Sequence, residues 1–180
     1  MHSLKKLKRF LPQEIKLFLV KSLIFPHFTY CNSVLNDMTV TLSNRLQRSQ
    51  NYCLRYAFNV RWDERITPYY VRANILKLID QRSIKILSLT HYIFKTGIPK
   101  YFSETFEYIS ERSASGSRSG SSLLRMPHHR TAAYDKSFTV TACRLWNSLP
   151  ESLRSIESRH RFVASLRCYY MERMAADGSS

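Results

Sequence analysis

DQRSIKILSLTHYIFKT, residues 80–96, is the stretch that decides the fold of this chain. Its apolar residues recur at helical spacing and occupy two faces of the helix that they predict. One face carries Ile84, Leu87, His91 and Phe94, and the other carries Ile86, Leu89 and Ile93. A helix with two apolar faces packs on both, so we expect it at the centre of a bundle. Asp80 suits its first turn, and Gly97 suits the left-handed conformation that ends a helix.

The chain before this central helix predicts a first helix from about Pro12 to Phe25, stopped by Pro26. Four residues at helical spacing form one apolar stripe, which we expect to face the core: Ile15, Phe18, Leu19 and Leu23. Lys16 and Lys21 fall off that stripe, so they are expected to face solvent or a ligand.

A second helix is predicted from about Thr41 to Phe58. The residues expected on its buried face are Leu42, Leu46, Cys53, Tyr56 and Ala57. Residues 63–66 then predict a turn, and a short helix follows from Pro68 to Asn74, with the proline in its first turn. Arg61 and Arg65 lie close on either side of the acidic pair Asp63-Glu64, so salt-bridged turn residues are the expected role of that pair.

Residues 111–122, ERSASGSRSGSS, predict a mobile Ser/Gly/Arg linker with almost nothing to bury. After it, a helix is expected over 136–147 with Trp146 as a core anchor, followed by a last helix capped by Ser158. That helix carries Phe162, Leu166, Tyr169 and Tyr170 on one face and Arg159, Arg161, Arg167 and Arg173 on much of the remainder.

The resulting fold class is all-α: a helical bundle, a Ser/Gly/Arg linker and a short C-terminal helical segment. The expected boundaries are 1–110 for the bundle, 111–122 for the linker, 123–174 for the C-terminal segment and 175–180 for a disordered tail. No run of residues is long and apolar enough to span a membrane, and no signal peptide is visible. The four cysteines are dispersed and are expected to be small, reduced core residues. An intracellular location, nuclear or cytoplasmic, is therefore expected.

The charge of the chain points to a polyanionic partner. Lys and Arg number 28 and Asp and Glu number 13, which gives a net charge of +15. Such an excess favours nucleic acid as the partner, although a basic surface with no dedicated partner stays an alternative. The cations gather in three clusters that we take as candidate phosphate contacts: Lys5, Lys6, Lys8, Arg9, Lys16 and Lys21; Arg45, Arg48 and Arg55; and Arg125 and Arg130, with His128 and His129 beside them.

The residues give no support to an independent enzyme. Cysteine and histidine are not spaced as zinc ligands, and no phosphate-binding glycine run or nucleophile elbow occurs. His27 is expected to be a packed or hydrogen-bonded structural residue. We therefore expect no catalytic residue, no metal, no cofactor and no small-molecule substrate on this chain.

Four segments follow one another in a recognisable order: KSLIFPHFTYC at 21–31, RLQRSQN at 45–51, LSLTHYIFKTGIPKYF at 87–102, and a tract at 123–170 that contains PHHRT at 127–131, RLWNSLPE at 144–151 and Phe162. Together they resemble the thumb and post-thumb C-terminal region of LINE-type (non-LTR, jockey-like) retrotransposon reverse transcriptases. RLWNSLPE is the sharpest of these matches, and the ordered set spans nearly the whole chain.

The resemblance implies a fragment of an RNA-directed DNA polymerase that would hold an RNA–DNA hybrid or the element RNA through a basic helical surface. Family polymerases use paired palm aspartates to hold two metal ions, and this sequence contains no Asp-Asp pair. Nucleic-acid binding without polymerisation is thus the expectation. The alternative is an inactive remnant or a co-opted protein-interaction module, with self-association through an apolar face expected beside Phe25, Phe28 and Tyr30.

Overall fold

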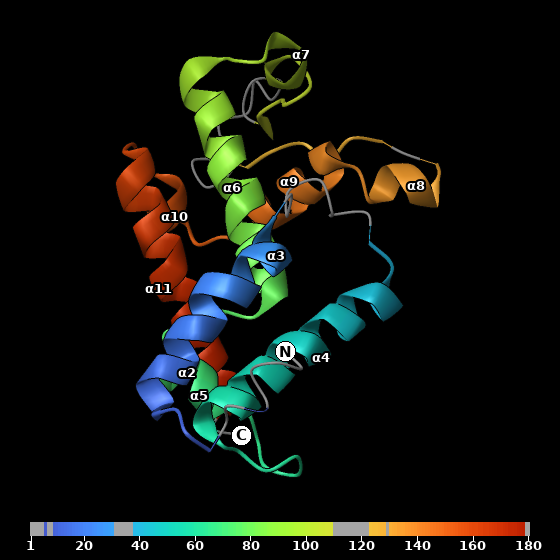
Figure 1. The fold of residues 1–180 in the computed structure, drawn as a ribbon. Helices are drawn as coiled ribbons and strands as arrows, with labels where there is room; N and C mark the ends of the chain where they lie inside the picture. The colour runs from blue at the N-terminus through green and yellow to red at the C-terminus, as the bar shows by residue number, and fades with distance from the viewer. Residues whose placement is uncertain (1–5, 7–8, 31–37, 110–122, 129, 179–180) are drawn as a thin grey trace. The chain divides into compact units, whose positions relative to one another are not determined.

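The computed structural model describes residues 6, 9–30, 38–109, 123–128 and 130–178 (Figure 1). The all-α fold class is confirmed, because the described residues form helices and no strand. An isolated antiparallel bridge joins Tyr108 to Leu124, with the Ile109 amide donating to the Leu123 carbonyl at 3.0 Å. The predicted linker at 111–122 lies outside the described residues.

The chain forms two compact units that do not follow the predicted boundaries. Unit 1 contains residues 1–32, 38–82 and 169–180, and unit 2 contains residues 33–37 and 83–168. Each unit therefore contains sequence from both sides of 111–122. The predicted disordered tail is wrong for residues 175–178, because the last helix continues to Gly178, while residues 179–180 lie outside the described part.

The helices of unit 1 are α2 (Gln13–Leu19), a π-helical turn η1 (Val20–Ile24), α3 (Phe25–Thr29), α4 (Val40–Phe58), α5 (Thr67–Arg72), the start of α6 (Leu78–Thr96) and the end of α11 (Arg159–Gly178). The Thr39 hydroxyl caps α4 by accepting the Leu42 amide at 3.4 Å, and Asn59 ends it in the left-handed conformation with φ at 56°. The buried face of α4 has Cys53, Tyr56 and Ala57 as predicted, but Leu42 is exposed.

Two predictions for the first helix are wrong. The chain stays helical past Pro26, since the Phe25 amide bonds to the Val20 carbonyl in a wider π turn. That turn relieves the clash between a proline ring and the carbonyl four residues earlier. The predicted inward stripe is also mostly outside: Ile15, Phe18 and Leu23 are 45%, 65% and 56% exposed. The side that packs contains Lys16 and Val20 instead.

Unit 2 is built from the rest of α6, α7 (Lys100–Ser103), α8 (Ala132–Asp135), α9 (Phe138–Asn147), α10 (Glu151–Arg154) and the first part of α11. Its core is an aromatic cluster in which Trp146 meets Phe94 edge to face at 5.0 Å and His91 stacks on Phe162 at 4.4 Å. Trp146 is 3% exposed, so its predicted role as a core anchor is confirmed.

The predicted character of the central helix is also confirmed within unit 2. Ile86 and Ile93 from one face of α6, and Leu87 and His91 from the other, are all buried. Gly97 ends the helix with φ at 67°, the left-handed conformation expected from the sequence.

The cysteines divide between core and surface. Cys53 and Cys143 are buried as predicted, and burial raises the pKa of each thiol to about 11 because it disfavours the thiolate. Cys168 on α11 is exposed, which contradicts the prediction for that residue, and Cys31 lies outside the described part.

Candidate nucleic-acid interface

A regular cationic surface lies on α4. Residues 38–62 contain four arginines and no acidic residue. Arg45, Arg48, Tyr52 and Arg55 recur every three or four residues, which places them on one face of the helix. Arg45, Arg48 and Tyr52 are exposed, and within the described residues no acidic side chain pairs with either arginine. We call Arg45, Arg48 and Tyr52 the α4 strip. From Arg45 to Arg55 the helix rises about 15 Å, or roughly four base-pair steps of a duplex.

Arg55, predicted as a phosphate contact, instead forms hydrogen bonds within unit 1. Its guanidinium is half-buried and donates to the carbonyl of Arg61 and, at 2.7 Å, to the carbonyl of Glu64. Both bonds tie the loop of residues 59–66 to the C-terminal end of α4. Its hydrogen bonds therefore assign Arg55 a positioning role in that loop.

Lys16 is not available to a ligand, so the expectation that it faces solvent or ligand is wrong. It is 3% exposed, and its Nζ donates to Oδ1 of Asn59 at 3.2 Å. The aliphatic stem is buried on the packing side of α2 while the ammonium satisfies the side chain that ends α4. Lys21 is exposed, but its Nζ donates to the Ala73 carbonyl at 2.9 Å.

The remaining predicted residues are dispersed. Lys6 and Arg9 are exposed, whereas Lys5 and Lys8 lie outside the described residues. In unit 2, Arg130 and His128 are exposed, and Arg125 pairs with Glu107 at 3.2 Å between half-exposed side chains. An exposed ion pair is weak, so Arg125 can exchange it for a phosphate at little cost. His27 is exposed, so of its two predicted roles, packed or hydrogen-bonded, the packed one is wrong.

A second acid-free helical segment was left out of the predicted set. Residues 158–171 contain no Asp or Glu, and Arg161 and Arg167 on α11 are exposed. Arg159 packs within unit 2, where its guanidinium lies 5.1 Å from the centroid of the Tyr92 ring. Arg173 forms an ion pair with Asp80 in unit 1 at 3.1 Å. The arginine spacing was visible in the sequence, but only the structure separates the partnered arginines from Arg161, for which the described residues supply no acidic partner.

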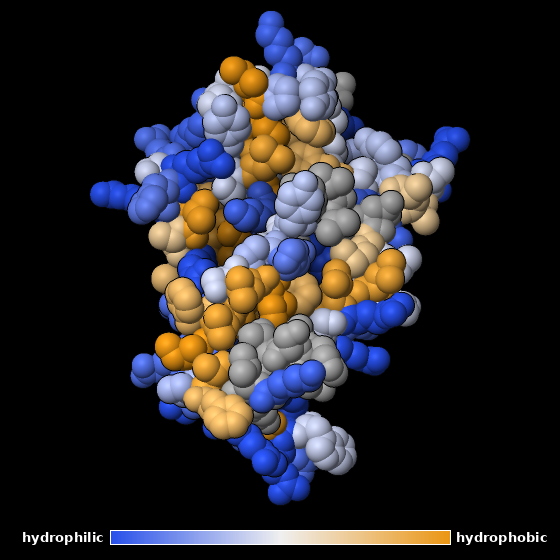
Figure 2. All heavy atoms as spheres, viewed as in Figure 1, coloured by the Kyte–Doolittle hydropathy of each residue, from blue (hydrophilic) through white to orange (hydrophobic). Residues whose placement is uncertain are grey.

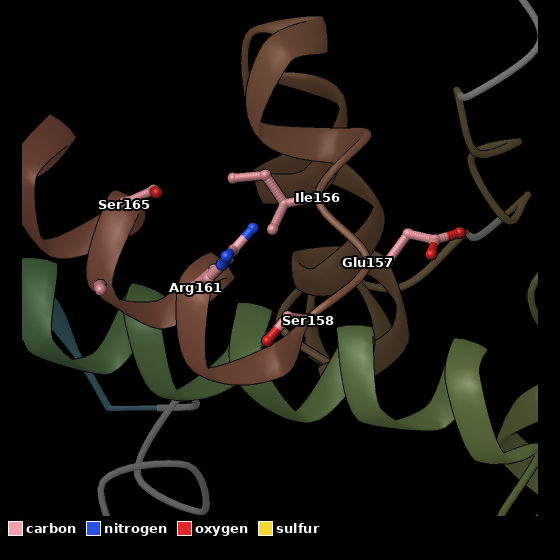
Figure 3. A pocket seen from close by; sticks show the side chains of 6 residues that line it. Ile156, Glu157, Ser158, Arg161 and Ser165 are labelled. Carbon is pink, nitrogen blue, oxygen red and sulfur yellow. The ribbon is translucent and has the colours of Figure 1, made fainter.

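Arg161 also borders a hollow of about 590 Å³ at the start of α11 (Figure 3). The residues that line it are Ile156, Glu157, Ser158, Arg161, Ala164 and Ser165. In Figure 3 Arg161 extends toward Ile156, whereas Glu157 points away. The lining contains two hydroxyl groups, one carboxylate and one cation, and it has neither histidine nor cysteine.

His91 lies in the core of unit 2 with one nitrogen satisfied. Its Nε2 is 2.8 Å from the Ile156 carbonyl, which only accepts, so Nε2 carries the proton. Within the described residues the buried Nδ1 has no partner. Burial lowers the pKa of His91, and the nearby charges of Lys95 and Arg159 lower it further against the opposing effect of the Ile156 bond.

We expect this histidine to make folding sensitive to mild acid. A His pKa that is lower in the folded state means that the unfolded chain binds the proton more readily. The free energy of unfolding should therefore be highest at pH values above 6.5, the ordinary pKa of histidine. It should fall as the pH drops below that value. His91→Gln keeps a donor toward Ile156 and removes the titration. Urea unfolding between pH 5 and 8 should show a flatter profile for the variant, and equal profiles would contradict the expectation.

An apolar surface lies exposed on unit 1. Apolar side chains gather over the α2–η1–α3 segment in Figure 2, and besides Ile15, Phe18 and Leu23 the preceding Phe10 is 81% exposed. We call these four residues the α2 apolar face. The surface predicted beside Phe25 and Phe28 is misplaced, because both rings pack against Val20, Cys53 and Tyr56. Tyr30 is 76% exposed, as predicted.

Searches of protein-family models, of curated proteins and of solved structures find no match to this chain. Among the described residues no three His, Cys, Asp or Glu side chains are grouped to hold a metal ion. No helix in the described part combines the length and apolarity needed to cross a membrane.

Proposed function

We propose that this chain is the thumb and post-thumb region of a LINE-type reverse transcriptase, and that it binds RNA or an RNA–DNA duplex without sequence preference. The observation that carries the binding proposal is the α4 strip, an acid-free helix face with two exposed arginines. Long cationic side chains on a shared surface are what phosphate contact requires, and such contact carries no sequence information.

The charge of the two units supports a polyanionic partner. Unit 1 contains 15 Lys and Arg against 6 Asp and Glu, a net charge of +9, and unit 2 contains 13 against 7, a net charge of +6. A positive excess in each unit favours extended contact along a nucleic-acid backbone. The proposed role is to hold the nucleic acid, while polymerisation would require palm carboxylates that this sequence lacks.

Fluorescence anisotropy with a labelled RNA–DNA duplex, measured over a series of salt concentrations, tests the proposal. The logarithm of the association constant should fall linearly with the logarithm of the salt concentration, because each neutralised phosphate releases counterions. Each such phosphate contributes about −0.9 to the slope of this line. The double variant Arg45→Gln/Arg48→Gln should reduce that slope by about two and weaken binding at low salt.

The matched control is Arg112→Gln/Arg118→Gln, which removes the same charge from residues 111–122. We expect it to change the slope much less than the α4 variant does. Binding that is absent at low salt, or that ignores salt, would remove the proposal. Equal effects of the two double variants would show that binding depends on the net charge of the chain and not on the position of the arginines on α4.

The α2 apolar face favours a second candidate, a protein-interaction module. Three large side chains on α2 and η1 and the preceding Phe10 present apolar area that water would otherwise cover. Sedimentation velocity at micromolar concentration distinguishes the candidates. Association that Phe18→Ser abolishes, together with negligible affinity for nucleic acid, would support this second function over the first.

A further inference from the structure

The loop of residues 59–66, which follows α4, presents a tryptophan to solvent. Trp62 is 85% exposed, whereas Trp146, the other tryptophan of the chain, is 3% exposed. Tryptophan is rarely left so open, because its large ring gains much from burial. Among the described residues no other ring lies against the indole, and its 85% exposure leaves it accessible to a ligand.

This loop is held in place by several independent contacts. Asn59 begins it in the left-handed conformation, and the Val60 amide donates to the Arg55 carbonyl at 3.0 Å. The Arg55 guanidinium reaches two loop carbonyls, those of Arg61 and Glu64. Figure 1 shows the loop projecting beyond the C-terminal end of α4.

The second half of the loop is fixed to α5. The Tyr69 hydroxyl donates to Oε1 of Glu64 at 2.5 Å, and the Tyr69 ring lies 5.3 Å from Phe58. Arg61 pairs with Asp63 at 3.3 Å. The acidic side chains of the loop are thereby engaged, while the exposed Arg65 has no acidic partner among the described residues. An exposed aromatic ring on an anchored loop loses little conformational freedom when it binds.

We propose that Trp62 stacks on an unpaired base of a single-stranded nucleic acid, with Arg65 beside it on the backbone phosphate. This inference rests on the proposed function, and it specifies that the loop of residues 59–66 binds a single strand. The α4 strip and Arg55 lie on the helix face that leads to the loop. A backbone that follows the α4 strip would thus bring a base within reach of Trp62. Stacking on an aromatic ring is strong for every base, so no sequence preference is needed.

Trp62 itself supplies the readout. Titrating the protein with a 20-nucleotide oligo(U) should quench the solvent-exposed part of the tryptophan emission, while the buried Trp146 provides a constant signal. A fully paired duplex of the same length should cause little quenching. Trp62→Ala should abolish the quenching and weaken oligo(U) binding by about 5- to 150-fold, the range observed for loss of one stacked base. Duplex binding should change less than twofold.

Two further variants keep the result specific. Tyr30→Ala removes another exposed aromatic side chain of unit 1 and should leave oligo(U) binding unchanged. Arg55→Lys keeps the charge but cannot donate to both loop carbonyls, so it should weaken oligo(U) binding and leave duplex binding intact. An oligo(U) affinity of Trp62→Ala equal to that of the unmodified protein would overturn the stacking proposal. The duplex anisotropy, measured separately, would still decide the proposed function.

Discussion

Phe162→Ala should lower the free energy of unfolding by about 3–5 kcal/mol, the range for deleting a fully buried phenylalanine. The side chain has no exposed surface, stacks on His91 at 4.4 Å and lies 5.9 Å from Trp146. Removing the ring leaves a cavity lined by other aromatic side chains, and such rings repack poorly around a void. Alanine is the better helix former, which recovers only a few tenths of a kcal/mol.

Urea unfolding followed by tryptophan fluorescence measures this loss, since Trp146 lies in the same cluster. Phe18→Ala is the matched control, because Phe18 is also helical but 65% exposed, and its effect should stay within about 0.5 kcal/mol. Phe162→Leu should fall between the two. A loss below about 1 kcal/mol for Phe162→Ala would mean that the cluster does not hold unit 2 together.

Tyr70→Phe should cost unit 1 about 1–3 kcal/mol although it removes a single oxygen atom. Tyr70 is fully buried, and its hydroxyl accepts from Nε2 of Gln47 at 2.7 Å and lies 2.7 Å from Oδ1 of Asn51. It is also 3.0 Å from Oε1 of the fully buried Gln50. Burial raises the pKa of the phenol, which keeps it neutral and able to donate at any physiological pH. Without the hydroxyl, each of these amide groups loses a hydrogen-bond partner, and water cannot replace it at the fully buried Gln50.

The neighbouring tyrosine is a close control. Tyr69→Phe removes a hydroxyl whose partner, Glu64, is exposed and can bond to water instead. We expect this variant to cost less than 1 kcal/mol in the same chemical denaturation experiment. If Tyr70→Phe were as mild as Tyr69→Phe, the bonds from Nε2 of Gln47 to Gln50 and Asn51 would satisfy these amides without the hydroxyl.

Periodicity in the sequence predicted the elements whose residue pattern is locally decisive. The apolar residues of the central helix α6 and Trp146 face the core, and Gly97 adopts the left-handed conformation that glycine accepts at a helix end. The orientation of α2 did not follow. Apolar residues occur on more than one side of that helix, and Lys16 is buried only because Asn59 stands where its ammonium can bond. A contact between residues 43 positions apart leaves no trace in local spacing.

The segments on which the proposed family origin rests contain architectural residues. Gln47, Gln50 and Asn51 of RLQRSQN surround the Tyr70 hydroxyl. Asn147 of RLWNSLPE bonds both the amide and the carbonyl of Leu124 at 2.8 Å. These residues specify packing, so they indicate which fold is built and say little about where a ligand binds.

The candidate site was predictable only as charge. Runs of arginine without acidic residues were visible on the segments that form α4 and α11, and they identify surfaces a polyanion prefers. Which arginines are free is a tertiary question, since Arg55 and Arg159 have the same local spacing as Arg48 and Arg161 but are engaged by a loop and by a ring. Trp62 gave no signal, because local spacing does not determine whether a single tryptophan in a loop is buried or exposed.

Helices α6 and α11 each begin in one compact unit and end in the other, so residues from both sides of 111–122 complete each core. The segments before and after residues 111–122 therefore each contribute to both units, and neither segment corresponds to one unit. Residues 1–109 and 123–180 made as separate fragments would each lack part of both cores, and they should recover their helices only on mixing. Such fragment complementation would make the chain a split protein, in which the recovery of helical structure reports that the two fragments have associated.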